Sequence, residues 1–199
     1  MTQVAIIDSG GANIASLVYA FDRLKISATL TDDAEIIQAA ERVVLPGVGA
    51  AKDAMARLRA AGLVDVVRNL TQPVLGICLG MQLLCDASEE EDVECLGIIP
   101  GTVRKLESTT NFPVPNMGWC ETHFRAPHNI LGSTENGSFF YYLHSYALPV
   151  SDNTLATAKH IDDFSAVIGR DNFVAAQFHP ERSSAAGAAL LNNFLSMSA

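Results

Sequence analysis

The sequence has few basic residues and no long apolar run. Thirteen Lys and Arg residues stand against 22 Asp and Glu residues, which gives a formal net charge of −9. Such a chain has no basic surface for a phosphate backbone, so we do not expect a nucleic-acid partner. No apolar run reaches the roughly 20 residues that cross a bilayer, and residues 1–8 lack the basic segment and cleavage site of a secretory leader. We therefore expect a soluble cytoplasmic protein that does not associate with a membrane.

The four cysteines lack the spacing of a metal site or a disulfide framework. Cys78, Cys85, Cys95 and Cys120 lie 7, 10 and 25 residues apart, with no C-x-x-C pair and no histidine at metal spacing. We expect neither a structural metal nor a cofactor. An isolated cysteine is by default a buried, unreactive thiol, and we assign Cys85, Cys95 and Cys120 to that class. Cys78 departs from it.

The N-terminal half alternates strand and helix signals. Val4–Ile7, Val43–Leu45 and Val74–Ile77 are apolar runs rich in β-branched residues, and each ends in Asp, Pro-Gly or Gly. This pattern is typical of buried parallel strands. Between the first two runs, Ile14–Leu24 has apolar residues at helical spacing and Ser27–Leu30 indicates a short strand. Length and a hydrophobic content of 49% favour one domain over residues 1–199.

The C-terminal half consists of strand-like segments separated by turn residues, which favours mixed or antiparallel pairing. A final helix is expected over 184–196, with Ala188, Leu191 and Leu195 on its apolar side. Residues 86–94 contain six acidic residues and are interpreted as a solvated loop. The fold class is therefore α/β, with a central mixed, mostly parallel sheet flanked by helices. The strand-like segments are Gly101–Leu106, Gly118–Phe124, Phe139–Leu148, Leu155–His160, Ala166–Gly169 and Phe173–Phe178.

The pentapeptide Gly76-Ile77-Cys78-Leu79-Gly80 follows an expected strand and precedes a helix-like stretch. A G-x-C-x-G sequence at that position is typical of a nucleophile elbow, in which two glycines make room for a sharp turn and the central backbone is strained. The helix N-terminus favours the thiolate form of the central cysteine. The N–H of Leu79 is then directed toward the position of an oxyanion. The alternative is a tight glycine turn around a buried thiol.

Two further stretches supply groups that thiolate chemistry requires. His179-Pro180-Glu181 follows the last expected strand, and the extended backbone before a proline lets the Glu181 carboxylate reach the imidazole. His179 is therefore the candidate general acid and base, and Glu181 orients it. In Pro46-Gly47-Val48-Gly49 the glycines let peptide N–H groups turn inward, so that Val48 and Leu79 bind an oxyanion together. Taken separately, these stretches would be a surface turn and an ordinary strand-loop-helix connection.

Three motifs in this order resemble the class I glutamine amidotransferases, and within them the glutaminase subunits of imidazole glycerol phosphate synthase. They are Pro46-Gly47-Val48-Gly49, Gly76-Ile77-Cys78-Leu79-Gly80-Met81-Gln82 and Phe178-His179-Pro180-Glu181. Weaker support comes from Asp8–Asn13, Pro115–Trp119, His144–Tyr146 and Arg182-Ser183. The resemblance spans essentially the whole chain and implies a single amidotransferase domain over residues 1–199 with a flavodoxin-like fold.

The resemblance implies that Cys78 attacks the side-chain carboxamide of glutamine and forms a γ-glutamyl thioester. His179 protonates the departing ammonia and then activates water, while Glu181 orients His179. The remaining roles that it implies are an oxyanion hole at Val48, Gly49 and Leu79, and substrate binding by Gly47, Gln82, Glu90, His144, Ser145 and Tyr146.

Proteins of this kind work in a heterodimer with a (β/α)8-barrel cyclase. Ammonia passes through the barrel to N′-[(5′-phosphoribulosyl)formimino]-AICAR-ribonucleotide, yielding imidazole glycerol phosphate and AICAR in histidine biosynthesis. The resemblance places Asn13, Trp119 and Arg182 at the interface with that partner. Free ammonia is mostly protonated at neutral pH and unreactive as a nucleophile, which favours its consumption away from solvent.

The sequence departs from the family pattern at three positions, and three other functions stay open. Asn116 stands where the family usually has His, Cys120 where it usually has Asn, and Ala51 where an aromatic residue is common. The alternatives are the glutaminase of another amidotransferase, a cysteine peptidase or deglycase on a similar elbow fold, and a non-catalytic scaffold subunit. The scaffold would lack a member of the triad, and none is missing here.

Overall fold

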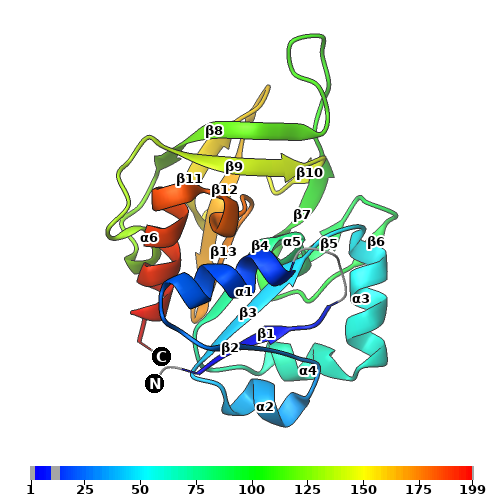
Figure 1. The fold of residues 1–199 in the computed structure, drawn as a ribbon. Coiled ribbons are helices and arrows are strands. Elements are labelled where there is room, and N and C mark those ends of the chain that lie inside the picture. Colours follow the sequence, from blue (N-terminus) through cyan, green and yellow to red (C-terminus); the bar gives the residue numbers. More distant parts are fainter. Residues whose placement is uncertain (1–2, 10–13, 199) are drawn as a thin grey trace.

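A nine-stranded mixed sheet forms the centre of the computed structural model, which describes residues 3–9 and 14–198 (Figure 1). Five strands pair in parallel, in the order β2-β1-β3-β4-β13. Four more continue from β13 as β12-β11-β8-β9 with antiparallel pairing. The strands are β1 (Val4–Ile7), β2 (Ala28–Thr31), β3 (Arg42–Gly47), β4 (Val74–Cys78), β8 (Asn116–Phe124), β9 (Ser138–His144), β11 (Thr154–Lys159), β12 (Asp163–Arg170) and β13 (Phe173–Ala176).

The α/β fold with a mixed sheet is confirmed, and the proportion of parallel pairing is lower than expected. Four strand pairings in this sheet are parallel and four are antiparallel, so the described sheet is evenly mixed and not mostly parallel. The parallel part coincides with the β-branched runs of the N-terminal half. The parallel part also includes β13. This strand follows the antiparallel strands in the sequence and pairs in parallel with β4.

Helices cover both faces of the sheet (Figure 1). Helices α2 (Ala34–Ala39), α3 (Ala51–Ala60) and α4 (Leu63–Arg68) pack on one face, while α1 (Ile14–Arg23) and α6 (Ser184–Leu195) pack on the other. Consecutive residues of β1 alternate between the two cores: Ala5 and Ile7 belong to the first, Val4 and Ile6 to the second. A strand buried on both sides needs apolar residues at every position, which explains its continuous apolar run.

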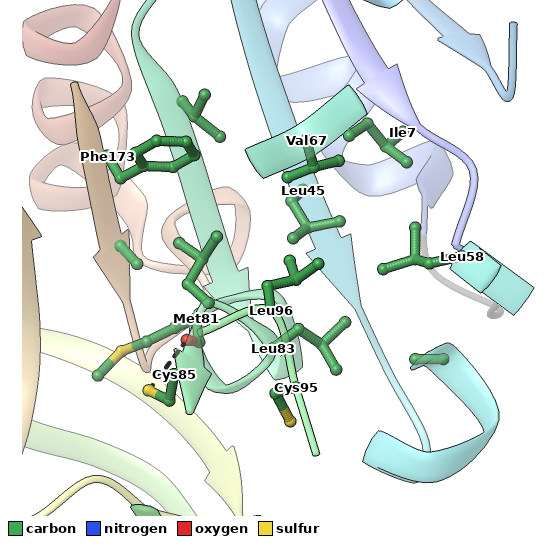
Figure 2. Close-up of a cluster of buried hydrophobic side chains, with 14 of the residues drawn as sticks. Ile7, Leu45, Leu58, Val67, Met81, Leu83, Cys85, Cys95, Leu96 and Phe173 are labelled. Atoms are coloured by element: carbon green, nitrogen blue, oxygen red, sulfur yellow. Dashed lines mark hydrogen bonds between the residues drawn. The ribbon is translucent and has the colours of Figure 1, made fainter. Parts of the chain in front are cut away.

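The first of these two cores also contains side chains of the short helix that follows Cys78, as Figure 2 shows. Met81 and Leu83 of α5 (Leu79–Leu83) belong to this core, and Figure 2 shows both of them near Leu96. The thiol of Cys85 lies in the same layer and donates to the Met81 carbonyl at 3.6 Å. Burial of this cluster stabilises the strand-to-helix turn. Each side chain of that size contributes about 1.5–3 kcal/mol to the free energy of folding when it is removed from water.

Two parts of the C-terminal half differ from the expectation. The expected strand over 139–148 is divided at Ser145 into β9 and β10 (Tyr146–Ala147), which belong to different sheets. The acidic run over 86–94 is not a simple loop, because it contains β5 (Cys85–Ser88) and β6 (Val93–Glu94). Together with β7 (Ile99–Lys105) and β10, these two strands form a second sheet in the order β10-β7-β5-β6. Within this run Glu89, Glu91 and Asp92, in the turn that joins β5 and β6, keep the expected exposed, turn-like character.

Two short helices and one helix face were not anticipated. Helices α2 and α4 have six residues each, too few for periodicity to distinguish them from a loop. In α6, Ala188 is exposed and does not lie on the buried side, contrary to the expectation. The buried side is formed by Gly187, Leu190, Leu191 and Phe194. No helix within the described ranges is long and apolar enough to span a membrane.

Candidate active site

The order of the parallel strands brings the three motifs to one edge of the sheet. Strand β4 lies between β3 and β13, and the register aligns Gly47 with Cys78 and Ala176 with Ile77. Because the strands are parallel, the segments after all three emerge side by side at their carboxyl ends. The loop after Gly47, the cysteine and the segment leading to His179 therefore meet although they are far apart in sequence.

The turn at Cys78 has the geometry of a nucleophile elbow. Its backbone has φ 53° and ψ −110°, a left-handed φ that non-glycine residues rarely adopt. A Cβ on Gly80 would lie 1.8 Å from the Leu45 carbonyl oxygen, and one on Gly76 would lie 3.0 Å from the Cβ of Ala175. The prediction that the turn needs both glycines and strains the cysteine backbone is confirmed. The following helix, α5, has only five residues, so its dipole is weaker than a long helix would provide.

His179 and Glu181 form a buried pair beside this turn. The His179 Nδ1 atom lies 2.9 Å from the Glu181 Oε1 atom, and 8% and 5% of the two side chains are exposed. Burial alone lowers the pKa of His179, but its hydrogen bonds with Cys78 and Glu181 and the negative charges of both groups raise it to about 10. A pKa in that range keeps the His179 imidazole protonated at neutral pH.

A third residue pins the turn that carries this pair. Pro180–Arg182 forms the short 3-10 helix η2, and the buried Ser183 follows it. The Ser183 hydroxyl donates to the His179 carbonyl at 2.6 Å and accepts from the N–H of Tyr141 at 2.9 Å. The N–H of His179 in turn donates to the Tyr141 carbonyl at 2.9 Å. Strand β9 therefore holds the backbone of the histidine from both sides.

Cys78 and His179 open into one cavity of about 380 Å³. This volume suits a molecule of the size of an amino acid. Both of these residues, and most of those that the resemblance assigned to substrate binding, contribute to its wall. The lining residues are Val48, Gly49, Cys78, Leu79, Gln82, Glu90, Pro115, Leu143, His144, Ser145, Tyr146, His179 and Arg182.

The residues expected to form an oxyanion hole line the cavity, whereas Gly47 lies behind it. Val48, Gly49 and Leu79 all line the wall next to Cys78. Gly47 is not among the lining residues, and a Cβ there would lie 2.9 Å from the Leu79 Cβ. Gly47 therefore lets β3 approach the elbow closely. Contrary to the expectation, Gly47 does not contribute to the wall of the cavity.

Gln82 and Glu90 are each fixed by the fold before a ligand is present. The Gln82 Nε2 atom donates to the Tyr146 carbonyl at 2.9 Å and to Gln177 Oε1 at 3.1 Å. A Glu90 carboxylate oxygen accepts from the N–H of Ala51 at 3.0 Å, so the β5–β6 hairpin caps α3, whose own N-cap residue, Ala50, makes no side-chain hydrogen bond. One acidic residue of the 86–94 run thus lies in the cavity wall.

His144 enters the cavity wall as a neutral ring. Its Nδ1 atom lies 3.0 Å from the Tyr146 carbonyl, which only accepts, so this nitrogen carries the proton. The Nε2 atom then accepts from the Asn116 side-chain amide at 3.1 Å. Burial lowers the pKa of His144 to about 4, and the charges of His160 and His179 act in the same direction. Asn116, one of the departures from the family pattern, therefore fixes the tautomer of a wall residue.

The other cysteines are separate from the cavity. Cys85 and Cys95 are buried, and burial raises the pKa of both thiols, that of Cys95 to about 11. Burial also raises the pKa of the Cys120 thiol, which donates to Asn116 Oδ1 at 3.7 Å. At neutral pH these thiols are protonated and weakly nucleophilic. Within the part of the chain that the structure describes, no group of three His, Cys, Asp or Glu side chains is arranged to hold a metal ion.

The expected partner-facing residues lie beside the cavity, on the solvent side of β8 and β9. Trp119 is 52% exposed, and Arg182 lies with its guanidinium carbon 4.5 Å from the centre of the Tyr141 ring. Arg182 lines the cavity and also a neighbouring pocket that contains Trp119. Asn13 lies outside the described residues.

The comparisons with known proteins agree with this geometry. The family model of class I glutamine amidotransferases matches residues 5–197. The chain belongs to the class I glutamine amidotransferase family. Subunit HisH of imidazole glycerol phosphate synthase from Xanthomonas axonopodis pv. citri is 49% identical over 198 residues, covering 100% of this chain and 99% of the relative. HisH 2 of Legionella pneumophila strain Paris is 48% identical over 194 residues, covering 98% of both.

Solved structures share the fold of this amidotransferase at low identity. A protein described as a putative GMP synthase component from Thermoplasma acidophilum has a TM-score of 0.76 at 17% identity, covering 98% of this chain and 92% of that one. Another, described as a glutamine amidotransferase, has a TM-score of 0.74 at 17% identity, covering 96% of each. The predicted family and fold are thus confirmed.

Sequence reasoning missed three groups at the site. The Leu143 carbonyl accepts from the Cys78 thiol at 3.7 Å, and the Gln177 side-chain amide lies 3.8 Å from the same sulfur. Ser183 fixes the backbone of His179. A backbone carbonyl has no sequence signature. Gln177 and Ser183 flank the His-Pro-Glu motif, and this proximity was the available signal for both.

Proposed function

We propose that this amidotransferase is the glutaminase subunit of imidazole glycerol phosphate synthase and hydrolyses glutamine to glutamate and ammonia. The observation that carries the proposal is the meeting of the Cys78 elbow with the buried His179–Glu181 pair in one cavity of amino-acid size. The full-length similarity to HisH subunits supports this pathway over the other amidotransferases.

The first half of the reaction uses the charge state of the pair. In the proposed reacting state His179 carries the proton and the Cys78 sulfur is a thiolate, which attacks the side-chain carbonyl carbon of glutamine. The N–H groups of Val48 and Leu79, two residues that line the cavity together with Cys78, stabilise the resulting oxyanion. His179 then protonates the departing nitrogen, and ammonia leaves behind a γ-glutamyl thioester. Glu181 holds the imidazole and stabilises its positive charge.

The second half of the reaction, hydrolysis of the thioester, depends on the loss of the negative charge on the sulfur. The sulfur no longer carries a negative charge, so one cause of the raised pKa of His179 is lost. The imidazole that has given up its proton then accepts one from water, and the hydroxide attacks the thioester. Glutamate is released and the thiolate–imidazolium pair is restored.

The ammonia is delivered, in this proposal, to a (β/α)8-barrel cyclase that docks on the β8–β9 outer face. This face consists of the side chains of β8 and β9 that point away from the core. Trp119 and Phe139 are 52% and 55% exposed, Met117 is 67% exposed and Leu143 37%. Exposed apolar side chains gathered on adjacent strands are typical of protein interfaces. The relatives are named as synthase subunits, which supports an assembly of this kind.

The decisive experiment replaces the nucleophile and supplies ammonia separately. Cys78→Ser should lower glutamine-dependent synthesis by at least about a thousandfold in the complex with the cyclase, while synthesis from added ammonium salt is retained. Cys95→Ser is the matched control, because it changes a thiol outside the cavity whose hydrogen bond goes to the Val93 carbonyl, and it should keep both activities. Full glutamine-dependent turnover by Cys78→Ser would remove this sulfur from the mechanism. Peptide cleavage without dependence on glutamine would favour the peptidase alternative.

A further inference from the structure

We propose that Gln177 is a positioning residue for the nucleophile, because its side-chain amide donates a hydrogen bond to the Cys78 sulfur and stabilises the sulfur as an anion. The proposal deepens the glutaminase function and rests on the assignment of Cys78 as nucleophile. It adds to the triad a neutral donor whose contribution does not depend on the proton of His179.

The fold brings Gln177 to the sulfur through strand pairing. Ala176, the last residue of β13, is aligned with Ile77, so the next residue on each strand lies at the same edge. The N–H of Gln177 donates to the Ala166 carbonyl at 2.9 Å, which fixes the backbone, and the side chain is fully buried. Its Nε2 atom lies 3.8 Å from the Cys78 sulfur. This distance lies within the range of a hydrogen bond to sulfur, whose larger radius lengthens the contact.

Neighbouring groups determine which end of the amide faces the sulfur. The Tyr146 carbonyl can only accept, so the Gln82 atom 2.9 Å from it must be the amide nitrogen. The second N–H of that nitrogen is directed at the Gln177 side chain 3.1 Å away, which must therefore present its oxygen. Turning the Gln177 amide over would place two NH2 groups against each other. The Gln177 nitrogen is thus left facing Cys78.

The sulfur lies between groups that favour opposite protonation states. The Leu143 carbonyl accepts from the thiol at 3.7 Å and so favours the protonated form. The Gln177 N–H favours the anion, because a donor stabilises the charged sulfur more than the neutral one. The sulfur is anionic twice in the reaction, before it attacks and when the thioester breaks. In the second case His179 has just taken a proton from water, and Gln177 donates without any proton transfer.

Gln177 acts on the sulfur and not on the substrate. It is absent from the residues that line the 380 Å³ cavity. Its substitution should therefore lower kcat and leave KM nearly unchanged, apart from any indirect effect through Gln82. Loss of packing alone would not shift the pH at which the sulfur becomes reactive. The pH profile of sulfur alkylation is therefore the informative measurement.

The experiment measures alkylation of Cys78 by iodoacetamide as a function of pH in the full-length protein, with the modified residue identified by mass spectrometry. Gln177→Met removes the amide at similar length. Gln177→Asn keeps an amide on a side chain that is one methylene shorter, which moves the amide away from the sulfur. This second variant tests the proposal if the Met variant does not fold. Ser165→Ala is the control, because Ser165 is buried on β12 and its hydroxyl is hydrogen-bonded to Thr154 and the Pro149 carbonyl and not to the sulfur.

We expect both Gln177 variants to shift the alkylation midpoint upward by about one pH unit, and alkylation at a pH below both midpoints to slow by about tenfold. The glutaminase kcat should fall in parallel, with KM changed less than about twofold. Ser165→Ala should leave the alkylation profile in place. An unchanged profile in a folded Gln177 variant overturns the proposal. Because alkylation requires no glutamine, this result is distinct from a failure of the wild-type protein to hydrolyse glutamine, which would overturn the proposed function.

Discussion

Gly80 shows how closely a single residue is constrained next to the nucleophile. A Cβ at this position would lie 1.8 Å from the Leu45 carbonyl oxygen, which is backbone and cannot move aside. Gly80→Ala should therefore lower the free energy of unfolding by about 3 kcal/mol or more, measured by urea denaturation. Gly169→Ala is the matched control, because its contact at 2.8 Å is with the flexible end of Leu155. Equal stability of the two variants would contradict the close approach.

Glu181 is one of the two groups, after Cys78, that raise the pKa of His179, and it offers a second test at this scale. Glu181→Gln keeps the shape and removes the negative charge, so the pKa of His179 should fall from about 10 and glutaminase kcat should drop by about 10²–10⁴-fold. The imidazole signal in NMR and an ammonia assay measure the two effects. Glu121→Gln, at an exposed carboxylate 3.7 Å from His123, should change neither. A Glu181→Gln variant whose His179 still titrates near pH 10 would refute the pairing.

At the residue scale, the sequence identified groups whose chemistry is local. Cys78, His179 and Glu181 stand in short motifs whose spacing and glycines have a direct geometric meaning. Gln177 and the Leu143 carbonyl act on the sulfur through contacts of sequence separation 99 and 65, which no local pattern reports. Gly47 was expected in the cavity wall because it stands in the same short motif as Val48 and Gly49, which do line the cavity. Gly47 itself permits the close approach of β3 to Leu79.

Among the elements, the short helix η2 depends on one hydroxyl. Ser183 bridges the His179 carbonyl and the Tyr141 N–H, both inside the fold. Ser183→Ala should leave those two groups with one partner fewer, lower stability by about 1–3 kcal/mol and reduce kcat by misplacing the imidazole. Ser183→Thr keeps the hydroxyl and should recover part of the activity. Thermal unfolding and steady-state kinetics distinguish the outcomes, and full activity of Ser183→Ala would show that η2 is held by other contacts.

The β8–β9 outer face carries a prediction about assembly. Trp119→Ala should weaken cyclase binding by at least about 2 kcal/mol, because large exposed aromatic residues dominate interface energies, while the unfolding midpoint changes little. Calorimetric titration with the cyclase measures the affinity. Tyr19→Ala, at a side chain 62% exposed on α1, is the comparison for a large exposed residue away from these strands. Undiminished binding by Trp119→Ala would exclude this face as the docking surface.

The sequence predicted elements best where burial is two-sided or periodicity is long. Val4–Ile7 matches β1, and the helix expected over Ile14–Leu24 is observed as Ile14–Arg23. The division of 139–148 into two strands was missed because both parts are apolar and the break at Ser145 follows from their membership in different sheets. The acidic run was interpreted as a loop because charge alone was considered, whereas Ser88 and Val93 are buried within its strands.

For the molecule as a whole, His144 predicts an acid limit to stability. The pKa of this ring is about 4 when folded and near 6.5 when unfolded, so the unfolded state binds more protons between those values. Its contribution is complete above about pH 6.5 and is lost as pH falls toward 4, with a magnitude of about 3 kcal/mol. Urea denaturation at several pH values measures the slope. His144→Gln should flatten the slope in this window, and an unchanged slope would contradict a neutral buried His144.

The opposite sign applies to His179. Its pKa in the folded state is raised to about 10, so the folded state binds more protons above pH 6.5. That contribution is present below about pH 6.5 and declines as pH rises toward 10. The contributions of these two rings are together largest near pH 6.5.

The side chains of strand β9 alternate between the core and the solvent: Phe140, Tyr142 and His144 face inward, and Phe139 and Leu143 face solvent. Because side chains change sides at every step, inserting one amino acid within this strand would reverse the facing of every residue on one side of the insertion, which would disrupt both docking and chemistry. Residues 106–115 form an irregular connection between β7 and β8 that projects from the body (Figure 1). An engineer who wishes to attach a fluorophore or an epitope should therefore choose that connection and leave the strand untouched.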